Sequence, residues 1–322
     1  MLTGLLARFP SAEVGVRLLY WRVGAARKVA DRLRTRMRRR AKVVATQPAP
    51  IQFDDVVATL RDAGIRMGDI LIVHSSFGAL KASGLSPEAI IQRLLALVGP
   101  EGTVAMPAIP IIAHEPSGGA KFDDAAYDRV FEYKPGSRRV QTGILPATLM
   151  GLPGAARSLH PGNAMVAVGA HAAEMMTDNI FGEAPTPCGP SSSWAYCWRR
   201  NAKVVALGVD LVHSLTMIHV AEDCFEDSWP VAGWYRRRRY RMIDDERVTE
   251  IAVRERKHGW SQYYAERAFA RDLHEAGVAK SWTVDGLAVH LCESATLISF
   301  LRSHPRPGYP YRFPFGLPAG PR

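Results

Sequence analysis

Short apolar runs alternate with amphipathic segments from Ile51 onward, and this alternation limits the possible folds more than any other feature of the chain. Four runs are typical of buried strands: 70–73, 103–106, 165–168 and 204–209. Four segments have helical spacing instead: 53–63, 88–98, 218–225 and 285–303. Ser86 followed by Pro87 is typical of a helix start. Alternating strands and helices predict an α/β protein, with a mixed central sheet in a layered α/β/α arrangement.

The basic residues are concentrated at the start of the chain. Residues 1–42 hold twelve Lys or Arg and only two acids, Glu13 and Asp31, so this segment alone carries the formal charge of +10. The remaining chain holds 29 basic and 29 acidic residues and is neutral. A neutral body argues against a nucleic-acid-binding function for the protein as a whole.

The basic segment also has helical spacing. Apolar residues recur every three to four positions between 12 and 42, which predicts one amphipathic helix, and Gln47–Pro50 then breaks the chain. We therefore divide the chain into a basic helical arm with linker (1–47), a main domain (48–305) and a tail rich in Pro, Gly and aromatic residues (306–322). The arm could pack on the body or on a second subunit, lie on an anionic membrane surface, or contact another partner. The sequence decides neither this role nor the oligomeric state.

Cysteine usage and hydropathy favour a cytoplasmic protein. Four cysteines are scattered without a C-x-x-C pair, which favours buried thiols over disulfides or a zinc–thiolate site. No apolar run reaches the roughly 18 residues that span a bilayer, and the N-terminus lacks the pattern of a secretory signal. We expect a cytoplasmic location, with peripheral membrane contact through residues 1–42 as an open alternative.

Two loops that adjoin predicted strands carry candidate polar groups. The first, His74-Ser75-Ser76-Phe77-Gly78, offers small residues and backbone N–H groups that suit a phosphate or a carbonyl oxygen. An ordinary turn capped by serine explains the same residues. The second loop places His160 before a proline at the mouth of a strand, where it is a candidate base or substrate ligand, or an ordinary loop histidine.

A third segment offers the components of general-base catalysis. Asp210 ends a predicted strand, and Thr216, His219 and Glu222 follow at helical spacing. A carboxylate beside a histidine is the standard arrangement for orienting an imidazole as a base. We predict that His219 is the general base, oriented by Asp210 or Glu222; a helix-surface ion pair is the alternative.

Acidic residues cluster directly after His219. Residues 222–227 contain four acids, which form either a solvated face or the site of a cationic ligand. In the second case Asp223, Glu226 and Asp227 would contact that ligand.

Taken in order, these segments resemble the aminoglycoside 3-N-acetyltransferase family. The resemblance runs from about residue 51 to 305. Its motifs are Gly68–Ser76, Leu97–Pro107, Arg157–Pro161, Val168–Ala170, and Leu207-Gly208 with Thr216-x-x-His219-x-x-Glu222.

The resemblance implies a function in antibiotic resistance: acetyl transfer from acetyl-CoA to an amine of an aminoglycoside or a related amino sugar, without a metal. It suggests that coenzyme A binds at His74, Ser75, Ser76, Gly78 and Thr216. It also suggests His219 with an acidic partner as the base, with His160 as the second choice. A polycationic acceptor would favour Asp223, Glu226 and Asp227 as its ligands.

The chain departs from the family pattern at three places. The segment Cys188–Trp194 replaces a Gly-x-Gly-Ser-Pro-like turn, His213 is unexpected, and the basic arm has no counterpart. A cell-surface or secondary-metabolite amino sugar is a rival acceptor.

Two other classes of protein stay open. One is a zinc-dependent amidase that uses His160, His213, His219, Asp210 and Glu222. The other is a non-catalytic, membrane-associated scaffold.

Overall fold

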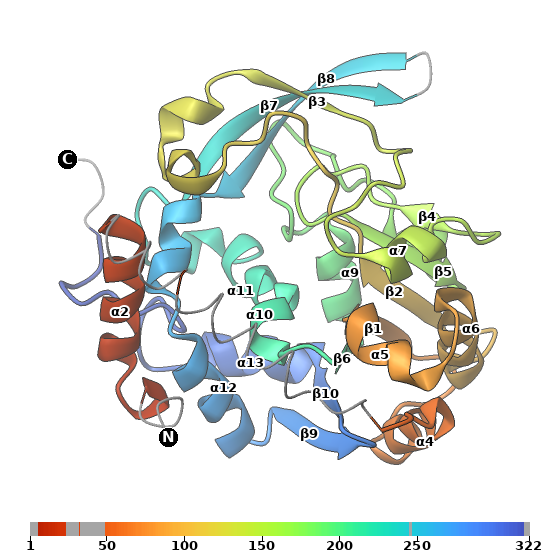
Figure 1. The fold of residues 1–322 in the computed structure, drawn as a ribbon. Helices are drawn as coiled ribbons and strands as arrows, with labels where there is room; N and C mark the ends of the chain where they lie inside the picture. The colour runs from red at the N-terminus through yellow and green to blue at the C-terminus, as the bar shows by residue number, and fades with distance from the viewer. Residues whose placement is uncertain (1–5, 24–31, 33–48, 245–246, 319–322) are drawn as a thin grey trace.

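A computed structural model of the protein describes residues 6–23, 32, 49–244 and 247–318. Its centre is a seven-stranded sheet with strand order β4-β5-β2-β1-β6-β10-β9 (Figure 1). β2, β1 and β6 are parallel, whereas β5, β4, β10 and β9 join by antiparallel pairing. The strands are β1 (Ile70–Ser75), β2 (Thr103–Pro107), β4 (Ala156–Arg157), β5 (Met165–Gly169), β6 (Lys203–Leu207), β9 (Ala279–Val284) and β10 (Leu287–Glu293).

Helices cover both faces of this sheet, because successive side chains of a strand point to opposite faces. Leu71 and Val73 pack with α4, α6 and α7 on one face. Ile70 and Ile72 pack with α9, α13 and the segment 211–221 on the other. The predicted α/β/α fold with a mixed sheet is therefore confirmed.

The longer helices are α2 (Pro10–Arg22), α4 (Phe53–Asp62), α6 (Pro87–Val98), α7 (Ile144–Leu149), α9 (Ser193–Arg199), α12 (Glu266–Glu275) and α13 (Ser294–Ser303). The short helices are α5 (Phe77–Leu80), α8 (Ala172–Met175), α10 (Leu211–Ser214) and α11 (Val220–Asp223). The 3-10 helices are η1 (Lys81–Ser83), η2 (Gly118–Phe122), η3 (Asp124–Tyr127), η4 (Thr216–His219), η5 (Glu226–Ser228) and η6 (His258–Tyr263).

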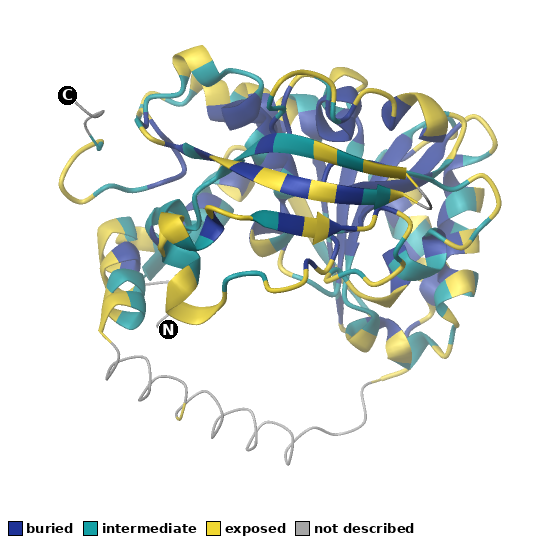
Figure 2. Ribbon diagram, turned by 90° about the horizontal axis from the view of Figure 1, so that it is seen from above, coloured by how far each residue is buried: buried dark blue, intermediate teal, exposed yellow. Residues whose placement is uncertain are grey.

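A second, three-stranded sheet has no counterpart in the sequence prediction. It consists of β3 (Val130–Tyr133), β7 (Tyr235–Asp244) and β8 (Arg247–Arg256), with β7 in the middle. Buried and exposed residues alternate along β7 (Figure 2), so that Arg236 and Arg238 point inward while Arg237 and Arg239 face solvent. This alternation directs two guanidinium groups of a four-arginine run into the protein.

The predicted helix over 285–303 is wrong in its first half. Residues 287–293 form β10, which pairs with β6 and β9, and α13 begins only at Ser294. Leu287, Val289 and Leu291 are buried at every second position, which is the period of a strand.

The N-terminal helix α2 packs against the main domain. Val14 is buried against Ala265 and Ala268. The buried Glu13 accepts hydrogen bonds from the backbone N–H of Arg267 at 3.2 Å and from its guanidinium at 3.1 Å. The helix predicted over 12–42 ends at Arg22, and Val23 is extended. The rest of that prediction lies outside the described residues, apart from residue 32.

The C-terminal segment also packs on the body. Tyr309 and Tyr311 are buried, and Tyr311 lies in an aromatic cluster with Val231 and Trp234. In the part of the chain that the structure describes, no helix is long and apolar enough to cross a membrane.

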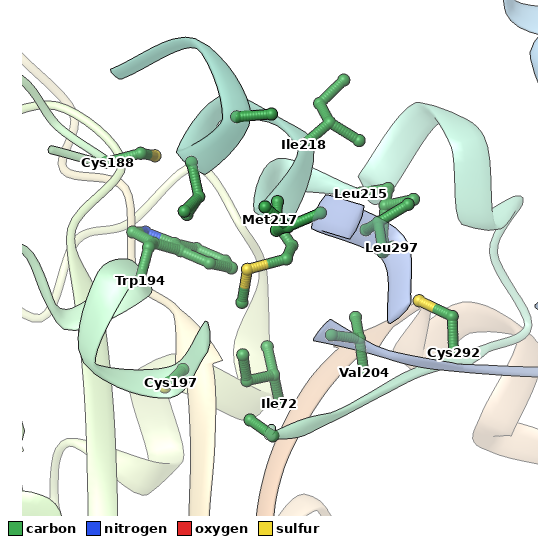
Figure 3. Packing of buried hydrophobic residues seen from close by; sticks show 14 of the residues in the cluster. Ile72, Cys188, Trp194, Cys197, Val204, Leu215, Met217, Ile218, Cys292 and Leu297 are labelled. Carbon is green, nitrogen blue, oxygen red and sulfur yellow. The ribbon is translucent and has the colours of Figure 1, made fainter. Parts of the chain in front are cut away.

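Apolar side chains fix the segment around η4 to the core. Leu215, Met217 and Ile218 belong to the same buried cluster as Trp194 and Leu297 (Figure 3). Since Met217 is fully buried, the backbone on either side of it is held in place. The polar residues at the ends of η4, Thr216 and His219, are therefore positioned by the core.

Candidate active site

A histidine and a glutamate meet where η4 joins α11. The Nδ1 atom of His219 lies 3.0 Å from Oε2 of Glu222. Because an ionised carboxylate can only accept, Nδ1 must carry the hydrogen and donate it. The Nε2 atom of His219 is then left with a lone pair that can take up a proton. The side chain of Glu222 is only 2% exposed, so this contact lies away from solvent.

Two residues from distant parts of the chain complete this site. The hydroxyl of Tyr311 donates to Oε1 of Glu222 at 2.8 Å, and Nη1 of Arg256 donates to the same hydroxyl. Nη1 of Arg256 also lies 3.4 Å from Nδ1 of His219 and 4.0 Å from Oε1 of Glu222. Both oxygens of Glu222 therefore accept hydrogen bonds, and the carboxylate is held in one orientation.

The surroundings of the pair favour a neutral imidazole beside a charged carboxylate. Burial, followed by the positive charge of Arg256, lowers the pKa of His219, while Glu222 acts in the opposite direction. Burial alone would raise the pKa of Glu222, but the contacts with His219, Arg256 and Tyr311 outweigh it and lower the pKa. A neutral imidazole is the protonation state that a general base needs.

His219 and Glu222 line a pocket of about 310 Å³. Its walls come from β7, β8 and the loops near residues 109–115 and 161–163. The ionisable residues in its lining are Glu115, His219, Glu222, Asp223, Arg238, Tyr240, Glu255, Arg256 and His258. Its volume is near the lower end of the roughly 300–1,000 Å³ of small-molecule sites.

A second cavity of about 250 Å³ adjoins the first, since Ile109 lines both. It is lined by His74, Ser75 and Thr216, three of the predicted coenzyme ligands. His74 is buried, which lowers its pKa to about 4, and its Nε2 atom has no hydrogen-bond partner among the described residues. A neutral, unpartnered imidazole nitrogen at this position can bind a polar ligand atom.

Two other predicted coenzyme ligands do not line this cavity. Oγ of Ser76 accepts from the N–H of Ala79 and caps α5, and the N–H of Ser76 donates to Leu207 at 3.0 Å. Gly78 lies within α5. The expectation of a free N–H at Ser76 is therefore wrong, because β1 continues its pairing with β6 up to that residue.

Asp210 does not orient His219. It caps α10 by accepting from the N–H of Val212 at 2.8 Å, and it lies 3.6 Å from Nδ1 of His213. The contacts of Asp210 and of the nearby Glu266 raise the pKa of His213 to about 10. The carboxylate beside His219 is thus Glu222, three residues later on the same helical turn.

His160 has a buried position with backbone contacts. Its Nδ1 accepts from the backbone N–H of Gly162 at 3.0 Å, its Nε2 lies 3.2 Å from the carbonyl oxygen of Pro185, and the residue is 1% exposed. Burial lowers its pKa to about 4. These contacts describe a histidine that holds two loops together.

The three acids predicted to bind a cation have separate positions. Asp223 lines the pocket, but it accepts from the N–H of Cys188 and from the hydroxyl of Tyr235. Burial, and then the charge of Glu222, raises the pKa of Asp223 to about 7. Glu226 pairs with Arg254 through both oxygens, at 2.7 and 2.9 Å, and Asp227 is exposed.

The five residues proposed for a zinc site are not brought together. In the described residues no group of three or more His, Cys, Asp or Glu side chains could hold a metal ion. His160 contacts backbone groups, whereas His213 pairs with Asp210 and Glu266. The four cysteines are free thiols, of which three are buried.

Comparison with known proteins identifies the family. The sequence model of the aminoglycoside 3-N-acetyltransferase family matches residues 72–304. The chain belongs to this family of acyltransferases. Both the resemblance found in the sequence and the enzyme class that it implied are confirmed.

Relatives of this family match most of the chain. Aminoglycoside N(3)-acetyltransferase VIII of Streptomyces fradiae is 28% identical over 271 residues, covering 78% of this chain and 90% of the relative. The crystal structure of aminoglycoside acetyltransferase AAC(3)-IIb has a TM-score of 0.62 at 25% identity and covers 79% and 96% of the two chains. The structure of AAC-IIIb, a binary complex with CoASH, shares the fold with a TM-score of 0.61 at 24% identity and covers 76% and 92%.

Sequence reasoning missed several residues that surround the pair of His219 and Glu222. Arg238, Glu255 and Arg256 come from the hairpin β7-β8, and Tyr311 follows the end of the family match. The sequence of β7 contains four consecutive arginines rather than an apolar–polar alternation, and no local pattern connects these residues with His219. Their meeting depends on the packing of the hairpin and the tail.

Proposed function

We propose that the protein is an acetyl-CoA-dependent N-acetyltransferase that acylates an amino group of an amino sugar, with His219 as the general base. The observation that carries this proposal is the buried contact between His219 and Glu222 at the wall of a pocket. A second cavity, lined by Thr216 at the other end of η4, adjoins that pocket. One short helix thus reaches both the acceptor site and the acyl-donor site.

The pair performs the proton transfer that an amine acceptor requires. An ammonium ion has no free electron pair, so it must lose a proton before its nitrogen can attack a carbonyl carbon. Nε2 of His219 takes this proton, and the imidazolium is stabilised by Glu222. The new bond joins the amine nitrogen to the acetyl carbon, and the bond from that carbon to sulfur breaks. The nitrogen loses its second proton as the amide forms; one of the two protons passes to the sulfur, and the other leaves to solvent by way of His219.

The second cavity suits the acyl donor. Acetyl-CoA, when bound, supplies the acetyl group as a thioester. Nε2 of His74 is buried and without a partner among the described residues, so it can contact a polar atom of the coenzyme. Ser75 and Thr216 add hydroxyl groups to the same wall. We therefore assign His74, Ser75 and Thr216 to the proposed acyl-donor site.

Replacing the base provides the test. In His219→Ala, kcat for acetyl-CoA and an amino-sugar acceptor should fall about 10²- to 10⁴-fold, while the dissociation constant for coenzyme A stays unchanged. His290→Ala is the matched control, because His290 lies on β10 and contacts Ser281 at 2.6 Å. Near-normal turnover in His219→Ala would remove His219 from the mechanism.

We also propose that the enzyme works in the cytoplasm and contacts anionic membrane surfaces through its N-terminal segment. Supporting this, α2 exposes Val16 and Leu19 on the side away from Val14, and Phe9, which precedes the helix, is exposed as well; each is more than half exposed. Residues 1–42 add the entire net charge of the protein. Apolar side chains beside basic residues are the combination that binds an anionic lipid surface.

A further inference from the structure

The charges that line the acceptor pocket differ from those that suit a polycation. Glu115 and Glu255 point to the pocket, but both pair with Arg238, at 2.8 and 3.0 Å. Glu255 also pairs with Arg236 at 2.8 Å. These carboxylates are already neutralised by guanidinium groups of β7 and attract an additional cation only weakly.

The other two acidic residues of the pocket, Glu222 and Asp223, also have hydrogen-bond partners within the protein. Glu222 accepts from His219 and Tyr311, and Asp223 accepts from a backbone N–H and from the hydroxyl of Tyr235. Both side chains are almost completely buried. Among the described lining residues, every carboxylate thus has its hydrogen-bonding partners within the protein.

Arg256 has a weaker ion-pair contact than Arg238, the other guanidinium that lines the pocket. Its ion-pair contact is Glu222 at 4.0 Å, the far limit of such a contact, and that oxygen already accepts from Tyr311. The side chain of Arg256 is 28% exposed, whereas that of Arg238 is 3% exposed. Arg256 therefore keeps donor capacity and positive charge at the pocket wall beside His219.

We propose that the acceptor carries an anionic group, a carboxylate or a phosphate, which Arg256 binds while the amine of the same molecule faces His219. This inference rests on the proposed acetyl transfer and narrows its acceptor class. A guanidinium binds either anion through paired N–H donors. A polycationic acceptor would instead place an ammonium group beside a like charge.

Matched acceptors test this proposal in the full-length wild-type enzyme. Glucosamine, glucosamine 6-phosphate and 2-amino-2-deoxygluconate differ in the presence and type of anion, and kanamycin supplies a polycation. We expect kcat/KM to be about tenfold or more higher for at least one anionic amine than for glucosamine and kanamycin. The two anionic acceptors separate phosphate from carboxylate recognition. A wild-type preference for kanamycin or glucosamine overturns the proposal.

Substitution of the arginine gives the second test. Arg256→Gln should lower kcat/KM for both acceptors, because Arg256 contacts Tyr311 and lies beside His219. The loss should be about 10- to 100-fold larger for the preferred anionic acceptor than for glucosamine. Arg256→Lys, which keeps the charge, should restore part of the loss. Arg237→Gln, on the exposed face of β7, is the control. An equal loss with both acceptors assigns Arg256 to the proton-transfer machinery and overturns its role in recognition.

Calorimetric binding separates failure of this inference from failure of the proposed function. If wild-type protein binds the anionic amine through Arg256 but acetylates none of the acceptors, the acetyl-transfer proposal fails and anion recognition stands. If it acetylates kanamycin and neither binds nor acetylates the anionic amines, the acetyl-transfer proposal stands and this inference fails.

Discussion

Removing the charge of Glu222 without removing its shape tests the central feature of the site. In Glu222→Gln the amide oxygen can still accept from Nδ1 of His219, now at 3.0 Å from the carboxylate, but the negative charge is lost. In the proposed mechanism, the carboxylate stabilises the imidazolium that forms when His219 takes a proton. A hydrogen bond to a charged group contributes roughly 1.5–3 kcal/mol, which corresponds to about a 10- to 150-fold loss in kcat.

The pH dependence of activity gives an independent test of the same contact, because the direction of its shift can be predicted. Glu222 raises the pKa of His219 against the lowering effects of burial and Arg256. Without that charge the pKa of His219 falls further, so the base stays neutral to lower pH. The acid limb of the profile of kcat/KM against pH should therefore move to lower pH, even as the maximal rate falls.

Steady-state assays of thiol release across pH 4–9 (roughly the range in which an imidazole titrates) measure both effects. Asp210→Asn is the matched control, because Asp210 contacts Val212 and His213 rather than His219. The control should keep the wild-type acid limb. This account of the pair is refuted if the acid limb of Glu222→Gln stays in place or moves to higher pH. It is also refuted if Asp210→Asn shows a shift of equal size.

Two further predictions concern other parts of the protein. His160→Ala should lower the free energy of unfolding by about 2–4 kcal/mol, because it removes a buried ring and its backbone contacts. The kcat of the folded variant should stay within about threefold of the wild-type value. Chemical denaturation followed by assays of the folded fraction checks this, and an inactive but stable variant would make His160 the base instead. Full-length protein should sediment with anionic vesicles at low salt and be released at high salt, as a basic surface requires. Failure to bind at low salt would exclude the membrane contact, with neutral vesicles as the control.

The alternation of strands and helices was readable from the sequence because burial on both faces requires continuous apolar runs. Ile70–Val73 is such a run, and it became the centre of the sheet. The pair of His219 and Glu222 was also readable, since residues three apart on a helical turn are neighbours whatever surrounds them. Local spacing fixed these features because their contacts are local.

The remainder of the site was decided by tertiary structure. Asp210 and Glu222 were equal candidates in the sequence, and only the turn at α10 directs Asp210 to His213. Arg256 and Tyr311 reach the site from 37 and 89 residues away along the chain, through the packing of a hairpin and a tail. The sequence predicted that the acids after His219 bind a cation, because it does not show their hydrogen-bond and ion-pair partners in space. The net charge at a site depends on all ionised groups that lie nearby in space, whereas the sequence shows directly only the neighbours along the chain.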